Sequence, residues 1–301
     1  MCACRFLRAR KFDVAKSVQL FRENLALRQQ HSPHEALAAG AEACLGCNPH
    51  AFRVFYPHVC HGFDRRNRVI FYERTGLLNA VAVGLMTTPS GLVAYHWLNM
   101  LGTLADALAA AARRAPLVTC SVVAVLDLDG MTRKTASKSV FDMLQALSAI
   151  DNTCFPEMLG KMVIINAPRI FVGVWEMAKS LASLDRRTVN KIEIISQRED
   201  SVRRLAELVG EESLPADYGG GGTPLFSFPP NVEHVKVPRR GVTTRESTVE
   251  AGWELILEVY TKTPGVEVIV TSRPASSAPG QHEVEVARST LQPSSGGERV
   301  R

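Results

Sequence analysis

Apolar side chains near the start of the chain recur at helical spacing. Residues 14–29 are predicted to form an amphipathic helix, because Asp13 is a favourable N-cap and apolar residues follow it every three or four positions. Those apolar residues are Val14, Val18, Phe21 and Leu25. The preceding segment FLRARKF is typical of the end of an earlier helix, so we expect the sequence to begin inside that helix, as a fragment would.

Short apolar runs alternate with helical periods through the centre of the chain. Strands are predicted at residues 69–74, 118–128, 162–166 and 192–196, and helices at residues 90–114, 135–150 and 199–209. The run 118–128 is almost continuously apolar, which is typical of a strand buried on both faces. Strands that alternate with helices predict an α/β fold with a mixed, largely parallel sheet.

The pattern changes after a run of four glycines at residues 219–222, which predicts a domain boundary. Beyond it, residues 253–260 and 266–270 alternate apolar and polar positions, as strands of a β-sandwich do. Residues 230–272 are therefore predicted to form a partial β-sandwich, shorter than the roughly 100 residues that such a domain usually takes. Residues 273–301 are rich in Ser, Pro and Gly and are predicted to be disordered.

The composition indicates a globular, cytosolic protein. The 301 residues, 46% of them hydrophobic, suffice for a full core and a smaller second domain. Apolar runs are far shorter than the roughly 18 to 20 residues that cross a bilayer, and the N-terminal MCACRFLRAR lacks the apolar core of a signal peptide. Residues 1–30 hold seven Lys or Arg against two acidic residues, which favours contact with anionic lipid or phosphate over nucleic acid. A merely solvated charged face is the alternative.

Motifs of common enzyme classes are absent from the sequence, which has no Gly-x-Ser-x-Gly, Gly-x-x-x-x-Gly-Lys-Ser/Thr or His-Glu-x-x-His. The Cys44-x-x-Cys47 pair, with histidines nearby, is a weak zinc signal because no second pair at matching spacing accompanies it. The seven cysteines are expected to be free thiols. We therefore expect a non-catalytic protein without a metal or other cofactor.

The segment after Pro168 is apolar on one helical face. That face comprises Phe171, Val174, Trp175, Ala178 and Leu181. Such a helix either packs onto the core or closes a site as a movable lid. Thr188 and Lys191 follow about one helical turn apart, and a hydroxyl beside a cation suits a phosphate or an inositol ring.

Four segments in the same order resemble a known family. They are FLRARKFDVAKSVQLF at 6–21, FPEMLGKMVIINAPRIF at 155–171, LDRRTVNKI at 184–192 and LPADYGG at 214–220. Together they resemble the CRAL-TRIO lipid-binding family, and within it the Sec-fourteen-type phosphatidylinositol transfer proteins, over about residues 4–222. Residues 230–272 are similar to a GOLD domain. The resemblance implies an N-terminal helical subdomain at 1–50 and a lipid-binding domain at 51–222.

The resemblance implies a pocket with a sheet as its floor, holding one lipid under a helical gate at residues 169–184. The implied headgroup residues are Arg10, Lys11, Glu157, Thr188 and Lys191. The implied gate and pocket residues are Phe171, Val174, Trp175, Ala178, Leu181, Val122 and Ala124. Pro168 disfavours a helical residue before it, so the Asn-Ala-Pro turn is predicted to hinge the gate.

The sequence also departs from the family pattern. Members that exchange phosphatidylcholine carry small hydroxyl residues where this chain has Val122 and Ala124, and Arg186 replaces a usual proline. The expected function is binding and transfer of phosphatidylinositol by a cytoplasmic protein that touches membranes, such as Golgi or endosomal ones. A carrier of a single-chain or isoprenoid ligand, or an adaptor that binds proteins through its GOLD-like segment, are the alternatives.

Overall fold

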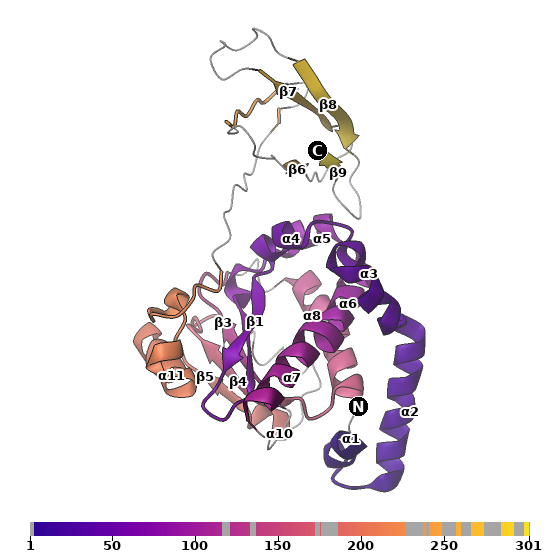
Figure 1. The fold of residues 1–301 in the computed structure, drawn as a ribbon, viewed down its shortest axis with the longest axis vertical. Coiled ribbons are helices and arrows are strands. Elements are labelled where there is room, and N and C mark those ends of the chain that lie inside the picture. Colours follow the sequence, from indigo (N-terminus) through magenta and orange to yellow (C-terminus); the bar gives the residue numbers. More distant parts are fainter. Residues whose placement is uncertain are drawn as a thin grey trace.

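A central sheet with helices on both sides forms the main body of the protein (Figure 1). The computed structural model describes residues 3–115, 121–132, 137–171, 175, 186–226, 237–238, 241–248, 257–259, 266–273, 284–291 and 298–300. This architecture confirms the predicted α/β fold with a largely parallel sheet.

The chain begins with helices that flank the sheet. They are α1 (Ala3–Ala9), α2 (Val14–His31), α3 (Pro33–Leu45) and α4 (Pro49–Phe55). Asp13 caps α2 as predicted, because its carboxylate accepts a hydrogen bond of 3.0 Å from the backbone N–H of Lys16. The apolar stripe that predicted this helix is exposed, however, since α2 buries Leu20 and Asn24 instead.

The described strands of the main body form one sheet in the order β1-β2-β3-β4-β5. They are β1 (His58–Phe63), β2 (Val69–Glu73), β3 (Val122–Asp127), β4 (Leu159–Ile165) and β5 (Ile192–Ile194). Within this sheet β1 pairs antiparallel with β2, and the other neighbouring strands pair in parallel. The prediction that the first strand begins at Val69 is wrong, because β1 is an edge strand whose sequence HVCHGF lacks a clear apolar alternation.

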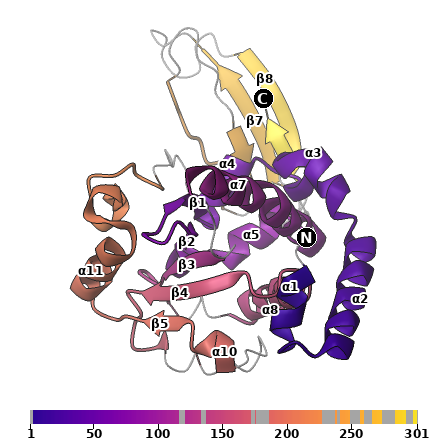
Figure 2. The ribbon, with the colours of Figure 1, turned by 60° about the horizontal axis from the view of Figure 1, so that its bottom comes forward.

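The remaining elements of the main body are mostly helical. They are the 3-10 turn η1 (Thr75–Leu77), α5 (Ala80–Met86), α6 (Pro89–Leu98), the π-helical turn η2 (Asn99–Thr103), α7 (Leu104–Arg114), α8 (Lys138–Cys154), α10 (Arg186–Val189), α11 (Arg198–Val209), η3 (Glu211–Ser213) and η4 (Ala216–Tyr218). The single helix predicted at 90–114 is thus α6 and α7 joined by a π-helical turn. Figure 2 shows α11 on the opposite side of the strands from α8.

The two faces of the sheet are filled unequally. The face under α11 is completely packed: its side chains are 1% exposed or less and contact Leu205 and Leu208 of α11. These side chains are Ile70, Tyr72, Val123, Val125, Val163 and Ile165. On the other face a row of paired residues crosses four strands, and all of them are only half-buried.

That row consists of Phe71, Ala124, Met162 and Ile192, which we call the floor row. Interior strands of a parallel sheet normally bury both faces. Phe71, Ala124 and Met162 lie on interior strands, so the accessible surface that they keep borders space that the described helices on this side do not fill.

Four further strands lie in the C-terminal part. They are β6 (Leu257–Val259), β7 (Val266–Ser272), β8 (Val284–Leu291) and β9 (Glu298–Val300). The pairs β7–β8 and β6–β9 are antiparallel, and β7 confirms the strand predicted at 266–270. The prediction of disorder after residue 273 is wrong for β8 and β9. The sequence of β8 hydrogen-bonds along β7 and so gives that strand its partner. Of the strand predicted at 253–260, only residues 257–259 are described.

A buried polar cluster closes the carboxyl end of β2. The Nδ1–H of His58 donates to Tyr56 O at 2.8 Å, and His58 Nε2 lies within hydrogen-bond distance of Tyr95 Oη at 3.2 Å. The Glu73 carboxylate accepts from Tyr56 Oη at 3.2 Å and from Thr75 Oγ1 at 2.8 Å. Burial lowers the pKa of His58 to about 4 and raises the pKa of Glu73.

The depressed pKa of His58 predicts a loss of stability in acid. As pH falls from about 6.5 to about 4, the unfolded chain binds a proton that folded His58 does not, which removes about 3 kcal/mol of stability. Glu73 acts in the opposite direction. Because its pKa is raised, it contributes stability to the fold at low pH, and this contribution is lost as pH rises through the raised pKa. The variant His58→Gln is therefore expected to lose less stability than the wild type over this range, measured by urea unfolding at several pH values.

The matched control for this comparison is His50→Gln, which changes an exposed histidine and is expected to keep the wild-type pH dependence. Equal pH dependence in the wild type and His58→Gln would show that this buried imidazole does not govern acid stability.

The unequal faces of the sheet predict unequal tolerance to added volume. Val125→Phe overpacks the filled face and is expected to cost about 1–3 kcal/mol of unfolding free energy. Ala124→Phe, one residue away on the floor row, is expected to stay within about 1 kcal/mol of the wild type. Urea unfolding of both variants measures the difference, and an equally large loss in Ala124→Phe would contradict the unfilled face.

Candidate functional site

The amino ends of β4 and β5 bring together three of the predicted headgroup residues. Glu157 lies in the turn before β4 with a left-handed backbone (φ 58°), and Lys191 directly precedes β5. Lys191 Nζ lies 3.4 Å from Glu157 Oε2. The backbone of Lys191 is fixed by bonds from its N–H to Thr188 O at 3.0 Å and from Met162 N to its carbonyl at 2.9 Å.

Two arginines that sequence reasoning missed complete this cluster. Arg187 Nη1 lies 3.6 Å from Glu157 Oε1, and Arg5 Nη1 donates to the backbone carbonyl of Glu157 at 3.1 Å. A hint existed in the consecutive arginines before Thr188. The contact of Arg5 spans 152 residues of sequence, however, and no local pattern predicts it.

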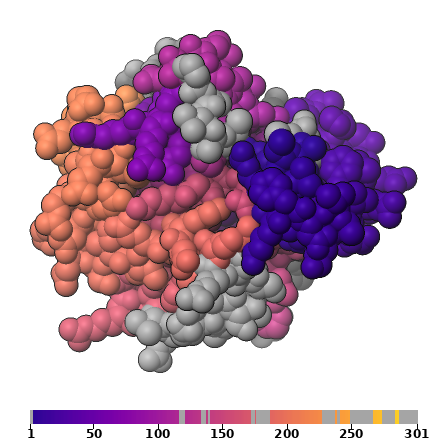
Figure 3. Space-filling model, turned by 90° about the horizontal axis from the view of Figure 1, so that it is seen from below, coloured from indigo at the N-terminus to yellow at the C-terminus, as the bar shows by residue number. Residues whose placement is uncertain are grey.

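Arg10 and Lys11 occupy the turn between α1 and α2, and both side chains are exposed. Lys11 has a left-handed backbone (φ 52°), and its N–H donates to Arg8 O at 3.1 Å, which closes the end of α1. Figure 3 shows the surface hollowed between the indigo N-terminal residues and the pink to orange residues that follow β4. The predicted headgroup roles of Arg10 and Lys11 stay predictions.

Two of the predicted gate residues pack over the floor. Phe171 is buried and Trp175 is half-buried, with ring centroids 6.1 Å apart. Their cluster includes Met162 and Ile192 of the floor row. Val174, Ala178 and Leu181, and with them most of the predicted gate at 169–184, lie outside the described residues.

The predicted hinge begins at a firmly anchored residue. Asn166 has a left-handed backbone (φ 53°), and its side-chain NH₂ donates to Asp127 Oδ1 at 2.8 Å. Its backbone N–H donates to Ser201 Oγ at 3.2 Å, and the next N–H, of Ala167, donates to Ile195 O at 3.0 Å. Any hinge motion must therefore start after Ala167, where Pro168 follows.

The two predicted pocket residues of β3 differ in their surroundings. Ala124 lies in the floor row, whereas Val122 is 8% exposed and packs with Leu104 and Ala111 of α7. Both residues face the same side of the sheet, but α7 covers Val122, so only Ala124 borders the space over the floor row. Its methyl group leaves more room there than any larger side chain would.

The cluster at the end of the floor suits an anion better than a metal ion. The cations of Arg187 and Lys191 lie beside one carboxylate, that of Glu157. Such cations bind phosphate through charge-assisted hydrogen bonds. Among the described residues, no group of three or more His, Cys, Asp or Glu could hold a metal ion. The weak zinc signal at Cys44 is not supported there, since the Cys44 thiol donates to Ala36 O and burial raises its pKa.

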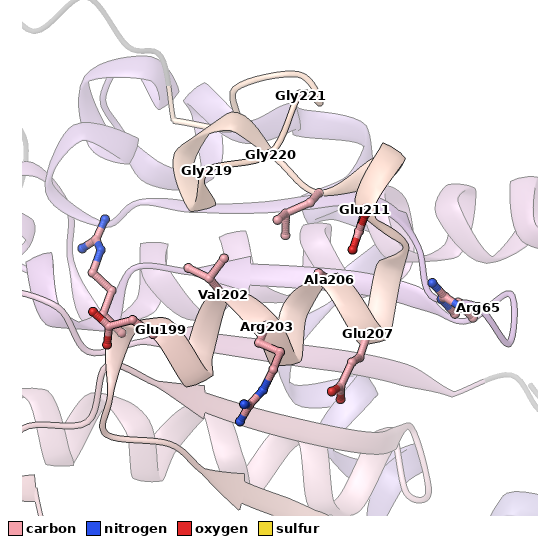
Figure 4. Close-up of a pocket in the computed structure, with 12 residues that line it drawn as sticks. Arg65, Glu199, Val202, Arg203, Ala206, Glu207, Glu211, Gly219, Gly220 and Gly221 are labelled. Carbon is pink, nitrogen blue, oxygen red and sulfur yellow. The ribbon is translucent and has the colours of Figure 1, made fainter.

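A groove of about 840 Å³ lies on the other side of the sheet (Figure 4). Val202 and Arg203 of α11 form one wall and the backbone of Gly219 to Gly221 another, with charges of both signs along the rim. It is separated from the floor row by the packed face of the sheet. No helix in the described part of the chain has the length and apolarity to cross a bilayer.

Comparisons with known proteins agree with this architecture. The chain is 30% identical over 225 residues to phosphatidylinositol/phosphatidylcholine transfer protein SFH12 of Arabidopsis thaliana, covering 73% of this chain but only 39% of that protein. It is 28% identical over 226 residues to the SEC14 cytosolic factor of Candida glabrata, covering 72% of this chain and 68% of that one. The crystal structure of Sfh5 shares the fold, with a TM-score of 0.56 at 17% identity over 74% of this chain and 72% of that one.

The family comparison covers the sheet and the cluster together. The model of the CRAL/TRIO domain matches residues 56–220, which is more than half of the chain and runs from β1 to the glycine run. This confirms the resemblance that four separate sequence segments indicated. The chain therefore belongs to the CRAL/TRIO domain family.

Proposed function

We propose that this chain is a non-catalytic carrier of one phospholipid, phosphatidylinositol, which it moves between membranes. The observation that carries the proposal is the floor row, a half-buried row of apolar side chains across four strands, next to a cluster of cations at the amino ends of β4 and β5. An apolar surface beside a fixed anion site matches the two ends of such a lipid.

The apolar end requires a large dry surface. Withdrawal of acyl chains from a bilayer costs about 0.8 kcal/mol per CH₂, so a lipid with about thirty methylenes gives up roughly 25 kcal/mol. Only burial against an extended apolar surface offsets this. The floor row, with Phe171 and Trp175 packed over part of the same face, supports this use.

The polar end requires hydrogen-bond donors for a phosphate and acceptors for ring hydroxyls. Lys191 supplies a cationic donor for the phosphate, the charge of Arg187 lies beside it, and the Glu157 carboxylate can accept from inositol hydroxyls. Both Lys191 and Glu157 are about a quarter exposed, with side-chain exposures of 27% and 26%. This partial burial strengthens their pairing with a ligand without removing the charges from water completely.

The relatives support the lipid class, since two of them are named as transfer proteins of phosphatidylinositol and phosphatidylcholine. Phosphatidylcholine is not the expected ligand of this chain, because Ala124 offers no hydroxyl on the floor. Its site of action is proposed to be the cytoplasmic face of membranes. A single-chain or isoprenoid ligand is disfavoured, because it carries no phosphate for the positive charges that Arg187 and Lys191 place beside the floor row.

Replacement of Lys191 by alanine tests the headgroup assignment. Loss of one charge-assisted hydrogen bond is expected to lower phosphatidylinositol transfer between vesicles about tenfold or more. Lys138→Ala is the matched control, because Lys138 is 87% exposed on α8 and pairs only locally with Asp142. Normal transfer by Lys191→Ala would refute the headgroup assignment, and recovery of a single-chain lipid by mass spectrometry of the purified wild type would refute the ligand.

Replacement of Ala124 by phenylalanine tests the floor. The added ring occupies the space over the floor row, so the folded variant is expected to retain far less co-purifying phospholipid than the wild type, as measured by mass spectrometry. Ala112→Phe on the exposed side of α7 is the control. A full complement of lipid in Ala124→Phe would show that the ligand does not lie over this row.

A further inference from the structure

We propose that Arg187 is a positioning residue that docks helix α1 against the headgroup cluster and thereby gives the site its preference for an anionic over a zwitterionic headgroup. This inference rests on the proposed function and deepens it. It concerns a residue that the family resemblance did not imply, and it depends on contacts between segments far apart in the sequence.

The guanidinium of Arg187 joins two parts of the molecule. Its Nη1 and Nη2 donate to the carbonyls of Arg8 at 3.1 Å and Ala9 at 2.9 Å, and Nη1 also lies 3.6 Å from Glu157 Oε1. The bond to Ala9 spans 178 residues of sequence. A planar fork with donors on several nitrogens can reach two carbonyls and a carboxylate that lie apart, whereas the three donors of an ammonium group all radiate from one atom.

The two carbonyls belong to the last residues of α1. Carbonyls at a helix C-terminus have no partner within the helix and carry the negative end of its dipole, so a cation there stabilises the helix. Arg187, which belongs to α10, therefore caps the C-terminus of α1. Arg5 adds a second tie from the same helix, because its Nη1 donates to the carbonyl of Glu157.

The turn that follows α1 carries Arg10 and Lys11. Its backbone is defined by hydrogen bonds back into α1, from Arg10 N to Phe6 O at 3.3 Å and from Phe12 N to Leu7 O at 2.7 Å. Wherever the end of α1 is held, this turn is held with it. The bonds of Arg187 to α1 thus determine where the two predicted headgroup cations stand relative to Lys191.

The charge balance of the cluster depends on the same residue. Without Arg187, the Glu157 carboxylate would pair with Lys191 alone, and only Arg5, on the backbone carbonyl of Glu157, would add a positive charge to this cluster of described residues. With it, two cations share one carboxylate, and the docked turn brings two more positive residues to that end of the molecule. A net positive site discriminates between headgroups that differ in net charge.

The experiment compares wild type, Arg187→Ala, Arg187→Lys, Arg10→Ala and the double variant Arg10→Ala/Arg187→Ala. Each protein is offered fluorescent phosphatidylinositol or phosphatidylcholine in phosphatidylcholine vesicles, and uptake of the two is measured separately. Hydrogen exchange of the α1 amides measures docking directly. Arg203→Ala is the control, since Arg203 is 70% exposed on α11 and pairs locally with Asp200.

We expect Arg187→Ala to lower phosphatidylinositol uptake about tenfold while uptake of phosphatidylcholine is unchanged. Exchange of α1 amides should quicken in Arg187→Ala and in Arg187→Lys, because lysine keeps the charge but not the fork. The double variant should be no weaker than Arg187→Ala alone, since that change already releases the turn that carries Arg10.

Three results would overturn the inference while the proposed function stands: recovery of the preference by Arg187→Lys, additive losses in the double variant, or equal losses of both lipids. Wild-type protein that takes up neither lipid overturns the proposed function, and the inference with it. Thermal melting of each variant shows that the comparison is made between folded proteins.

Discussion

Close packing of α11 on one face of the central sheet is the interaction on which the rest of the structure depends. Six side chains at 1% exposure or less fix the strands from that side. Because the sheet is held by this face, the opposite face need not be filled to keep the fold intact. An incompletely packed apolar surface is costly in most proteins. Here it is tolerated because the strands are held by the packed face under α11 and, beside the floor row, by buried residues such as Val122 and Ile164.

The polar end of the site is built by a different principle. Its charges come from turns at the amino ends of β4 and β5 and from a helix at the other end of the sequence. The strands place Glu157 and Lys191 at neighbouring positions, because Met162 N bonds to Lys191 O across the ladder. The helix is then attached by arginines. Secondary structure provides the frame and charge pairs between distant segments complete it.

Features set by local physics could be predicted from the sequence. The N-cap residue Asp13 predicted α2. The apolar runs predicted β3 and β4, because a strand buried on both faces requires a continuous apolar sequence. The grouping of Glu157, Thr188 and Lys191 came from the family resemblance. Features set by tertiary contact could not be predicted, because they produce no periodic pattern in the sequence. They are the edge strand β1, the π-helical turn η2 and the bonds of Arg187 to α1.

The exposed apolar stripe of α2 shows that periodicity predicts a helix but not which of its faces is buried. Val14 is 65% exposed and Leu25 51%, although their spacing predicts a helix as well as any buried face would. Spacing identifies a helix and its apolar side, but which side meets the core depends on the neighbouring helices. Here Leu20 lies on the face that packs inward.

Both ends of β4 are bounded by residues with left-handed backbone that are not glycine, Glu157 before it and Asn166 after it. This conformation is unfavourable for Glu and persists where the surroundings enforce it, whereas Asn adopts it more readily and is held here by its bonds to Asp127 and Ser201. The strand can therefore neither lengthen nor slip, and its seven residues set a fixed span of roughly 20 Å between the charged cluster and the hinge. One leaflet of a bilayer is about 15 Å of hydrocarbon. A lipid held by its headgroup at Glu157, as proposed, would extend its chains along a span of constant length, so the reach of the chains would add to the preference for a headgroup.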